Sequence, residues 1–216
     1  MTGRRRSHGP GPKSRKYHHG NLREALIEAA LTLISDRGPG GFSFADAARA
    51  AGVSPAAPYR HFRDREALIA AVAARGFEKL ARALTTATPG EEQSAQATLQ
   101  RLGEAYLAFA RDEPALFAAM YESGTDLATA REEGQGPDAV FAVIYEVCAA
   151  LVETLASATK PPARMMALHV TSVMHGIASL YGRGDAGRQP IPMEPAELLE
   201  AGLLIYLEGL GFSEKS

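Results

Sequence analysis

The segment at residues 43–62 constrains the fold of this chain more than any other feature of the sequence. Ser43 is a favourable N-cap for a short helix that ends near Gly52. Ser54 is a favourable N-cap for a second short helix, which has Pro55 in its first position. Two short capped helices joined by a tight turn form a helix-turn-helix, whose second helix enters the major groove of DNA. The segment therefore predicts a nucleic-acid-binding motif.

The second helix of this motif is rich in hydrogen-bond donors and begins with small side chains. Small residues let the backbone approach base edges, while hydroxyl, guanidinium and imidazole groups suit phosphate oxygens and guanine edges. The residues concerned are Ala56, Ala57, Tyr59, Arg60 and His61. The alternative is a helical hairpin in which Tyr59 and Phe62 pack into a core and the charges are solvated. Three donors in consecutive positions cannot all face inward, which favours the DNA-binding interpretation.

Charge is divided unevenly along the chain. The whole sequence of 216 residues has a net charge of −2, which by itself says nothing about partners. Residues 1–65, however, carry 12 Lys and Arg against 5 Asp and Glu, a balance of +7, and the remainder therefore carries −9. A basic end joined to an acidic body is typical of a nucleic-acid-binding module attached to a separate domain.

Apolar residues recur at helical spacing through the rest of the chain, and no segment alternates with period two for long enough to predict a strand. The fold class is therefore all-α. We expect a disordered basic tail over 1–19, a helix-turn-helix domain over 20–65 and a helical effector-binding and dimerisation domain over 66–216. Helices are expected at 21–37, with Asn21 as N-cap, and at 43–51, 54–62, 64–84, 91–111, 113–121, 137–158, 161–183 and 194–211.

The sequence indicates a cytoplasmic protein. Its one cysteine, Cys148, cannot form an internal disulfide, which favours a reducing compartment, and its apolar surroundings predict a buried hydrophobe. The basic start at residues 4–10 is followed by Gly, Pro and Lys instead of an apolar stretch. The longest apolar run, 139–158, is interrupted by Glu146 and Glu153, so no membrane contact is predicted. When bound to DNA, the protein would be associated with the nucleoid.

Residues 17–85 resemble the TetR family of one-component bacterial transcriptional regulators. The resemblance rests on the helical pattern up to Gly38 and on the run FSFADAARAAGVSPAAPYRHFRDREAL. It also rests on the spacing of a tyrosine, a phenylalanine, a basic residue and a leucine at Tyr59, Phe62, Arg65 and Leu68. Pro58 departs from the commonest family pattern. As the fourth residue of the expected helix, it should cost less than the roughly 3 kcal/mol of an interior proline.

The resemblance implies a set of DNA contacts. Ser43 would bind phosphate from the start of its helix, and Arg65 would bind phosphate from the start of the helix that follows the motif. The basic tail, through residues 4–16, would lie along or in a minor groove, or else serve only to solubilise the chain. The complete predicted set within the motif is Ser43, Ser54, Ala56, Ala57, Tyr59, Arg60, His61 and Arg65.

Residues 90–211 resemble a TetR subgroup whose next-to-last helix carries a Trp-His-Gly signature, which reads Met174-His175-Gly176 in this chain. The resemblance implies that the last two helices pair with those of a second copy in a four-helix bundle. Such a homodimer would read a palindromic site. Small residues at helical spacing and an apolar last helix agree with this arrangement. The predicted interface residues are Ser172, Gly176, Ser179, Leu199, Leu203 and Tyr206.

The same resemblance implies a pocket for a small-molecule effector of unknown identity. Apolar and hydrogen-bonding groups of the kind that line pockets are Phe117, Met120, Tyr121, Phe141, Tyr145, Met166, His169 and Met174. Their alternative role is ordinary core packing. His169 and His175 are six residues apart, which does not place them on one metal-binding face, and no metal or cofactor is predicted.

The sequence thus predicts a regulator, most simply a repressor, that binds double-stranded DNA as a homodimer and is released by its effector. Two alternatives remain at this point. One is an all-α protein-interaction module, whose apolar last helix would bind another protein. The other is a small helical enzyme. The sequence has no HExxH, phosphate-loop, GxGxxG or nucleophile-elbow motif, which counts against this alternative.

Overall fold

In the computed structural model, the described residues are 22–88, 94–124, 126–134, 136–155, 160–182 and 191–211. All regular structure within these ranges is helical, which confirms the all-α fold class. A short 3₁₀-helix, η1, spans Pro58–Arg60. The α-helices are α1 (Leu22–Arg37), α2 (Phe44–Ala50), α3 (Arg65–Ala87), α4 (Ala95–Asp112), α5 (Pro114–Tyr121), α6 (Leu127–Glu133), α7 (Pro137–Thr154), α8 (Ala163–Gly182) and α9 (Pro195–Gly209).

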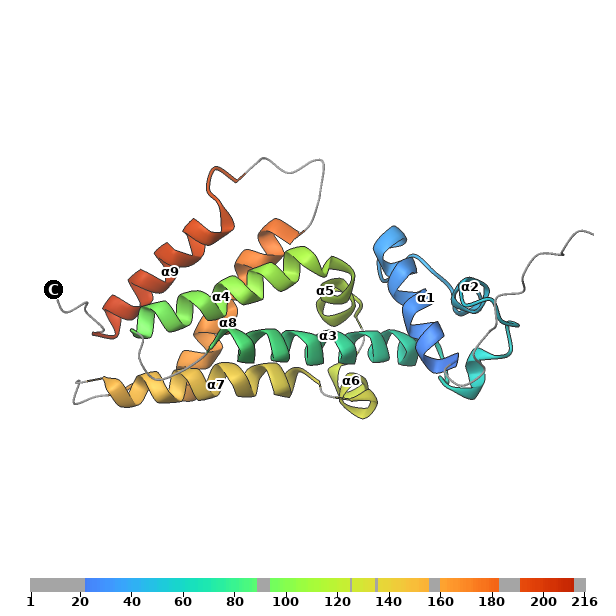
Figure 1. The fold of residues 1–216 in the computed structure, drawn as a ribbon, viewed down its shortest axis with the longest axis horizontal. Helices are drawn as coiled ribbons and strands as arrows, with labels where there is room; N and C mark the ends of the chain where they lie inside the picture. Colours follow the sequence, from blue (N-terminus) through green and yellow to red (C-terminus); the bar gives the residue numbers. More distant parts are fainter. Residues whose placement is uncertain are drawn as a thin grey trace, which may run out of the picture.

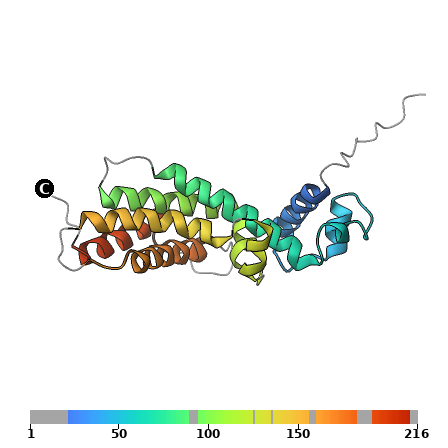
Figure 2. The same ribbon diagram turned by 90° about the horizontal axis from the view of Figure 1, so that it is seen from below.

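Helix α3 connects the two ends of an elongated molecule. At one end it packs against α1, and along its length it packs against α4, α5, α6 and α7 (Figures 1 and 2). Asp64 begins the helix as its N-cap, accepting a hydrogen bond from the Ala67 amide at 2.8 Å. Its apolar stripe, which includes Phe77, Leu80 and Leu84, is fully buried. One helix therefore belongs to the cores of both ends.

Two glycines let neighbouring helices approach closely in the body. A Cβ atom on Gly76 would lie 2.5 Å from the Sδ atom of Met120, where α3 crosses α5. A Cβ atom on Gly103 would lie 2.6 Å from Cδ2 of Leu199, where α4 meets α9. Both distances are well inside van der Waals contact, so glycine at these positions sets how tightly the helices pack.

The predicted α-helix over 54–62 is wrong. Turns lead into η1, and the local bonds are mostly short-range: the Ala57 amide donates to the Ser54 carbonyl at 3.0 Å and the His61 amide to the Pro58 carbonyl at 2.9 Å. Pro58 has no amide hydrogen to donate back to residue 54, and its ring would crowd that carbonyl in an α-helix. Beginning the 3₁₀-helix at Pro58 avoids both problems, because the first residue of a helix has no backbone bond to donate.

Helix α6 was not expected, because the glycines around it indicated a loop. Asp126 is its N-cap and accepts from the Ala128 amide at 3.0 Å, so the start signal was present in the sequence. The remaining predicted helices are confirmed, with ends that differ by about one turn or less. The predicted Asn21 cap and basic tail lie outside the described residues. Among the described helices, none combines the length and apolarity needed to cross a bilayer.

Candidate nucleic-acid interface

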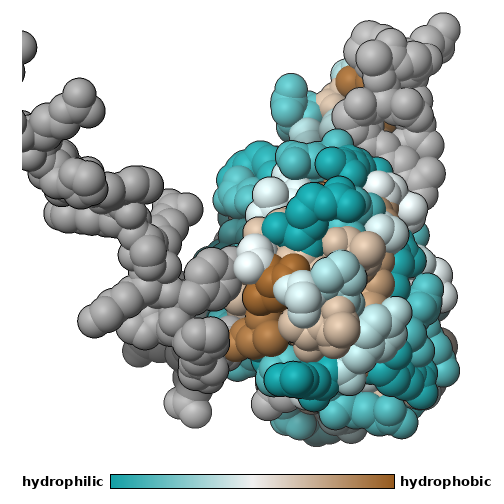
Figure 3. All heavy atoms as spheres, turned by 90° about the vertical axis from the view of Figure 1, so that its right-hand side faces the viewer, coloured by the Kyte–Doolittle hydropathy of each residue, from teal (hydrophilic) through white to brown (hydrophobic). Residues whose placement is uncertain are grey.

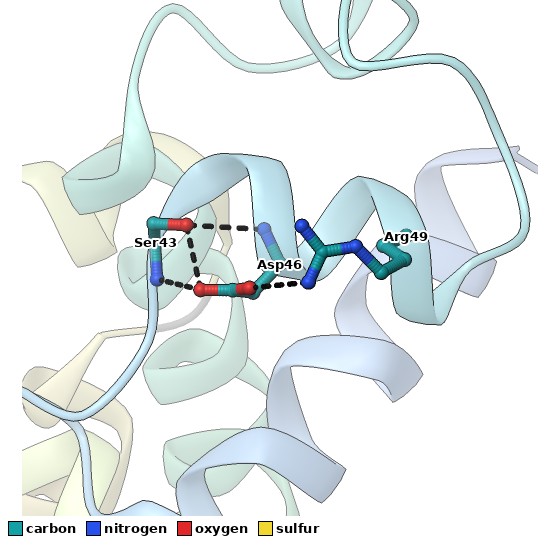
Figure 4. Close-up of polar contacts among 3 residues, drawn as sticks. All are labelled: Ser43, Asp46 and Arg49. Atoms are coloured by element: carbon teal, nitrogen blue, oxygen red, sulfur yellow. Dashed lines mark hydrogen bonds and ion pairs between the residues drawn. The ribbon is translucent and has the colours of Figure 1, made fainter.

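The start of α2 is held by a compact polar network (Figure 4). The Ser43 hydroxyl accepts from the Asp46 amide at 3.1 Å and donates to the Asp46 carboxylate at 2.6 Å. That carboxylate also accepts from the Ser43 amide at 2.9 Å and from Arg49 at 3.0 Å. The hydrogen bonds from the Ser43 side chain and backbone, followed by the charge of Arg49, lower the pKa of Asp46. The network orients Ser43 and Arg49 on the exposed surface.

Tyr59 and Phe62 have opposite environments, which decides between the two interpretations of the motif. The Tyr59 side chain is 64% exposed, and its ring stands edge-on against Phe44 of α2 with 5.0 Å between ring centroids. Phe62 is only 3% exposed and belongs to the core. The alternative hairpin, which buried both rings, is therefore wrong for Tyr59. The contact with Phe44 holds the exposed Tyr59 ring next to α2.

The other predicted contacts of the motif lie on the same exposed segment. Ser54, Ala56, Arg60 and His61 are exposed, and Ala57 is half-buried. Viewed from this end, the surface is largely hydrophilic around a small apolar area (Figure 3). The 54–61 segment thus leaves its donors accessible to a partner and contacts α2 through the Tyr59 and Phe44 rings.

Arg65 is placed differently from the other predicted contacts. Its guanidinium donates from Nε to the Phe42 carbonyl at 2.8 Å and from a terminal nitrogen to the Pro39 carbonyl, and it lies 4.8 Å from the centre of the Phe42 ring. The side chain is only 23% exposed. These contacts tie the loop before α2 to the start of α3. They compete with the predicted phosphate contact, because two of the three guanidinium nitrogens already donate to backbone carbonyls.

Ion pairs hold α1 against the rest of the molecule. Arg75 of α3 pairs with both Glu24 and Glu28 of α1. Arg23 of α1 pairs with Glu133 at the end of α6. Together with the buried apolar side chains of α1, these contacts join α1 to α3 and α6.

Part of the predicted effector set forms an aromatic cluster in the core. Phe117 is buried and stacks on the His175 ring, with 5.6 Å between centroids. The Tyr106 hydroxyl lies 3.1 Å from Nδ1 of His175 and 3.3 Å from the Tyr121 hydroxyl. Burial raises the pKa of both tyrosines and lowers that of His175. Met120, Met166 and Met174 are also buried in the core.

The rest of the predicted effector set lies elsewhere. Phe141 and Tyr145 of α7 stack with 6.4 Å between centroids, and Arg164 of α8 lies over the Phe141 ring. His169 is exposed and stands edge-on to Tyr206, at 5.6 Å between ring centroids. The ring contacts of the described residues therefore do not join the eight predicted residues into one cluster. Met166 and Met174 of α8 are fully buried, which agrees with their alternative role in core packing.

The sequence did not reveal a cavity of about 710 Å³ between α4, the start of α5, the end of α8 and the start of α9. None of the eight predicted effector residues lines it. Glu104, Tyr181 and Glu194 contribute its polar groups together with Arg111. Its walls come from four separate helices, so no local pattern in the sequence could reveal it.

The predicted interface residues divide between the outside and the inside of the chain. Ser172 and Gly176 are exposed on α8, whereas the Ser179 hydroxyl faces Nε2 of His175 at 3.4 Å. Leu199 and Leu203 of α9 are buried within the chain and offer no surface to a second copy. Tyr206 is half-buried. The large exposed apolar side chains of α8 and α9 are instead Met165, Leu168, Leu180, Leu204 and Ile205.

Cys148 lies fully buried in α7, which confirms its prediction as a buried hydrophobe. Burial raises the pKa of its thiol to about 12, so the reactive thiolate is suppressed.

Two families match the sequence over most of the described chain. Residues 26–72 match the family described as "Bacterial regulatory proteins, tetR family", and residues 99–205 match "Tetracyclin repressor-like, C-terminal domain". The first match spans α2 and the 54–61 segment, and the second spans most of the helices of the body. A comparison with curated proteins found no match.

Solved structures have the same fold. A Rhodococcus sp. RHA1 protein of unknown function is 32% identical, with a TM-score of 0.71, over 91% of this chain and 99% of that one. The TetR-family regulator PfmR from Thermus thermophilus is 21% identical, with a TM-score of 0.63, over 86% and 98% of the two chains. The fatty acid degradation regulator FadR from Bacillus halodurans is 15% identical, with a TM-score of 0.69, over 91% and 98%.

Family models match both ends of the chain, and the neighbour that is 32% identical is covered over 99% of its length. The exposed donors of the helix-turn-helix agree with these matches. The chain therefore belongs to the TetR family of bacterial transcriptional regulators, and it is a DNA-binding regulator rather than an enzyme.

Proposed function

We propose that this regulator is a repressor that binds a palindromic operator as a homodimer and is released by a small-molecule effector. The observation that carries the proposal is the set of large apolar side chains that α8 and α9 leave exposed, on helices that lie away from the DNA-binding end (Figure 1). Several exposed large apolar side chains on two neighbouring helices favour a partner that covers them.

A second copy of the chain suits this surface. Ser172 and Gly176 are exposed beside Leu168 on α8, and a Cβ atom on Gly176 would touch nothing within the chain. A helix from another subunit can therefore approach closely at Gly176. Two-fold symmetry would then present two copies of the 54–61 segment to half-sites about 34–36 Å apart.

Effector release requires that the body and the DNA-binding end share a moving part, and α3 suits that role. It packs in the body against α5, α6 and α7, and Arg75 joins it to α1. An effector that binds more tightly to one orientation of α3 would change the spacing of the two recognition segments. A tenfold loss of DNA affinity needs a difference of about 1.4 kcal/mol between the two states.

The proposal is tested by selecting bound duplexes from a random pool with the full chain and measuring its mass in solution. A dimer that enriches a palindrome with two half-sites supports it, and the enriched duplex then serves to screen compounds for release. A reporter driven by a promoter that carries the operator tests repression. A monomer, an enriched site without symmetry, or higher expression from the reporter when the regulator is present would contradict the corresponding part.

A further inference from the structure

The cavity of about 710 Å³ in the body has a mainly apolar wall with few polar groups. Leucine, alanine and proline side chains from α4, α5, α8 and α9 form most of it, as in the binding sites of small organic molecules. Its volume lies within the range of about 300–1,000 Å³ that is typical of such sites.

The negative and positive charges of the described lining residues do not balance. Glu104 of α4 accepts one hydrogen bond from the neutral Gln100 side chain at 3.0 Å, so its charge is not neutralised by that contact. Glu194, at the start of α9, is a second carboxylate in the lining. Among the described lining residues Arg111 is the cationic one, but it already forms a two-bond pair with Asp112, with N···O distances of 2.7 and 3.1 Å. The described part of the lining therefore presents excess negative charge.

Tyr181 adds an aromatic side chain to the same wall. Its hydroxyl donates to the carbonyl of Met193, which joins the end of α8 to the residues before α9. The pKa of Tyr181 is raised by burial and then by the charges of Glu194 and Glu197. The negative charge of α9 thus acts on the wall of the cavity.

We propose that this cavity binds an organic cation with an apolar, aromatic body. The carboxylates of Glu104 and Glu194 would attract the charge, the Tyr181 ring would contact the cation or its rings, and the aliphatic wall would bury the rest. This deepens the proposed function, on which it rests, because it names the chemical class of the effector.

The position of the cavity also connects it to the DNA-binding end. Pro114, at the start of α5, lines this cavity and also a smaller one of about 330 Å³ between α1 and residues 112–115. Glu113 in the same segment pairs with Lys79 of α3. A ligand that displaces Pro114 therefore displaces a segment that contacts both α1 and α3. Figure 1 shows α5 between α4 and α1.

The first experiment measures binding to the full chain by calorimetry in the absence of DNA. The probe is tetraphenylphosphonium, and the matched control is tetraphenylborate, an anion of nearly the same size and shape. Binding of the cation with clear preference over the anion supports the proposal. Equal binding of the two ions, or no binding of the cation at millimolar concentration, overturns it.

The second experiment locates the cation with conservative variants. The double variant Glu104→Gln, Glu194→Gln keeps the shape of the side chains, and it should weaken binding of the cation about tenfold. Glu146→Gln, on the exposed surface of α7, removes one charge away from the cavity and should leave binding unchanged. Equal affinity of wild type and double variant would place the cation elsewhere and overturn the assignment.

Addition of the probe to the protein–operator complex completes the test. Release by the cation in wild type, with about tenfold more cation needed for the double variant, supports the effector role of this cavity. Cation binding that depends on the two glutamates but does not change operator affinity overturns the effector role and leaves the binding site standing. A chain that binds the cation and enriches no DNA in the selection would contradict the proposed function alone.

Discussion

At the scale of single residues, Arg65 shows how tertiary contacts reassign a side chain. Its position in the motif implied a phosphate contact, yet its guanidinium binds the carbonyls of Phe42 and Pro39. These bonds fix the loop before α2, which ends at Ser43, the first of the predicted DNA contacts.

Replacing Arg65 by Gln should destabilise the fold by about 1–3 kcal/mol, because two backbone carbonyls lose a charged donor. DNA affinity should also fall, while the slope of log K against log salt stays the same because the number of bound phosphates does not change. Urea unfolding and salt-dependent DNA titration measure the two effects. Arg82→Gln, in an exposed ion pair on α3, is the control and should change neither. A slope reduced by about 0.9 with unchanged stability would restore the phosphate contact.

The capping network of Ser43 and Asp46 should make the stability of the protein depend on pH. The pKa of Asp46 lies below the ordinary value of 3.8, so its ionised form stabilises the folded state. That stabilisation is complete above the ordinary pKa and is lost as the pH falls through the lowered pKa of the folded state. The melting temperature of wild type should therefore exceed that of Asp46→Asn at pH 6, and the difference should shrink below about pH 3.8. A difference that is constant with pH would contradict this.

At the scale of elements, the helix-turn-helix depends on its turn and on the short η1. Gly52 has φ of +71°, in the left-handed region that other residues adopt at a cost. The Val53 amide then donates to the Ala48 carbonyl at 3.0 Å, which closes the end of α2. The turn thus sets the direction in which the 54–61 segment leaves α2.

Replacing Gly52 by Ala should destabilise the protein by about 1–2 kcal/mol, because the added Cβ atom is strained in this conformation. Gly209→Ala, at the end of α9 where a Cβ atom meets nothing, is the matched control and should be neutral or slightly stabilising. Urea unfolding of both variants compares them directly. Equal stability of the two variants would show that the turn tolerates a side chain.

The elements also show where sequence-based prediction succeeds and fails. The starts of α2 and α3 were predicted from Ser43 and Asp64, because an N-cap acts within three residues of itself. The 54–62 helix was predicted wrongly, since Pro58 was treated as an inexpensive member of an α-helix. The cavity and the contacts of Arg65 could not be predicted, because they join residues from elements far apart in the sequence.

At the scale of the whole molecule, the balance of +7 over residues 1–65 and −9 over the rest orients the protein on DNA. The basic tail contributes Arg4, Arg5, Arg6, Lys13, Arg15 and Lys16 to that balance. Its removal should weaken binding to all duplexes and flatten the salt dependence, by about 0.9 in slope for each phosphate that the tail no longer binds. Titration of full-length and truncated protein at several salt concentrations tests this. An unchanged slope would reject a role for the tail in binding DNA.

The exposed apolar face of α8 and α9 leads to a prediction about assembly. Ile205 is 72% exposed in the single chain, so Ile205→Glu should leave the fold intact and convert a dimer into monomers. Affinity for a palindromic operator should fall with it, because each half-site would then bind independently. Light scattering measures the mass, and Tyr145→Glu on α7 controls for a charge at another exposed apolar position. A dimer that survives Ile205→Glu would place the interface elsewhere.

The sequence by itself determined the helical fold class, the caps of α2 and α3 and the donors of the 54–61 segment. These features act over a few residues, so their neighbours in sequence are also their partners in space. Only the tertiary structure decided that Leu199 faces inward against Gly103, that Ile205 faces outward, and that Glu104 and Glu194 share a cavity. An amphipathic helix shows which of its residues are apolar, whereas the packing of distant helices decides which apolar face is covered by the chain and which is left for a partner.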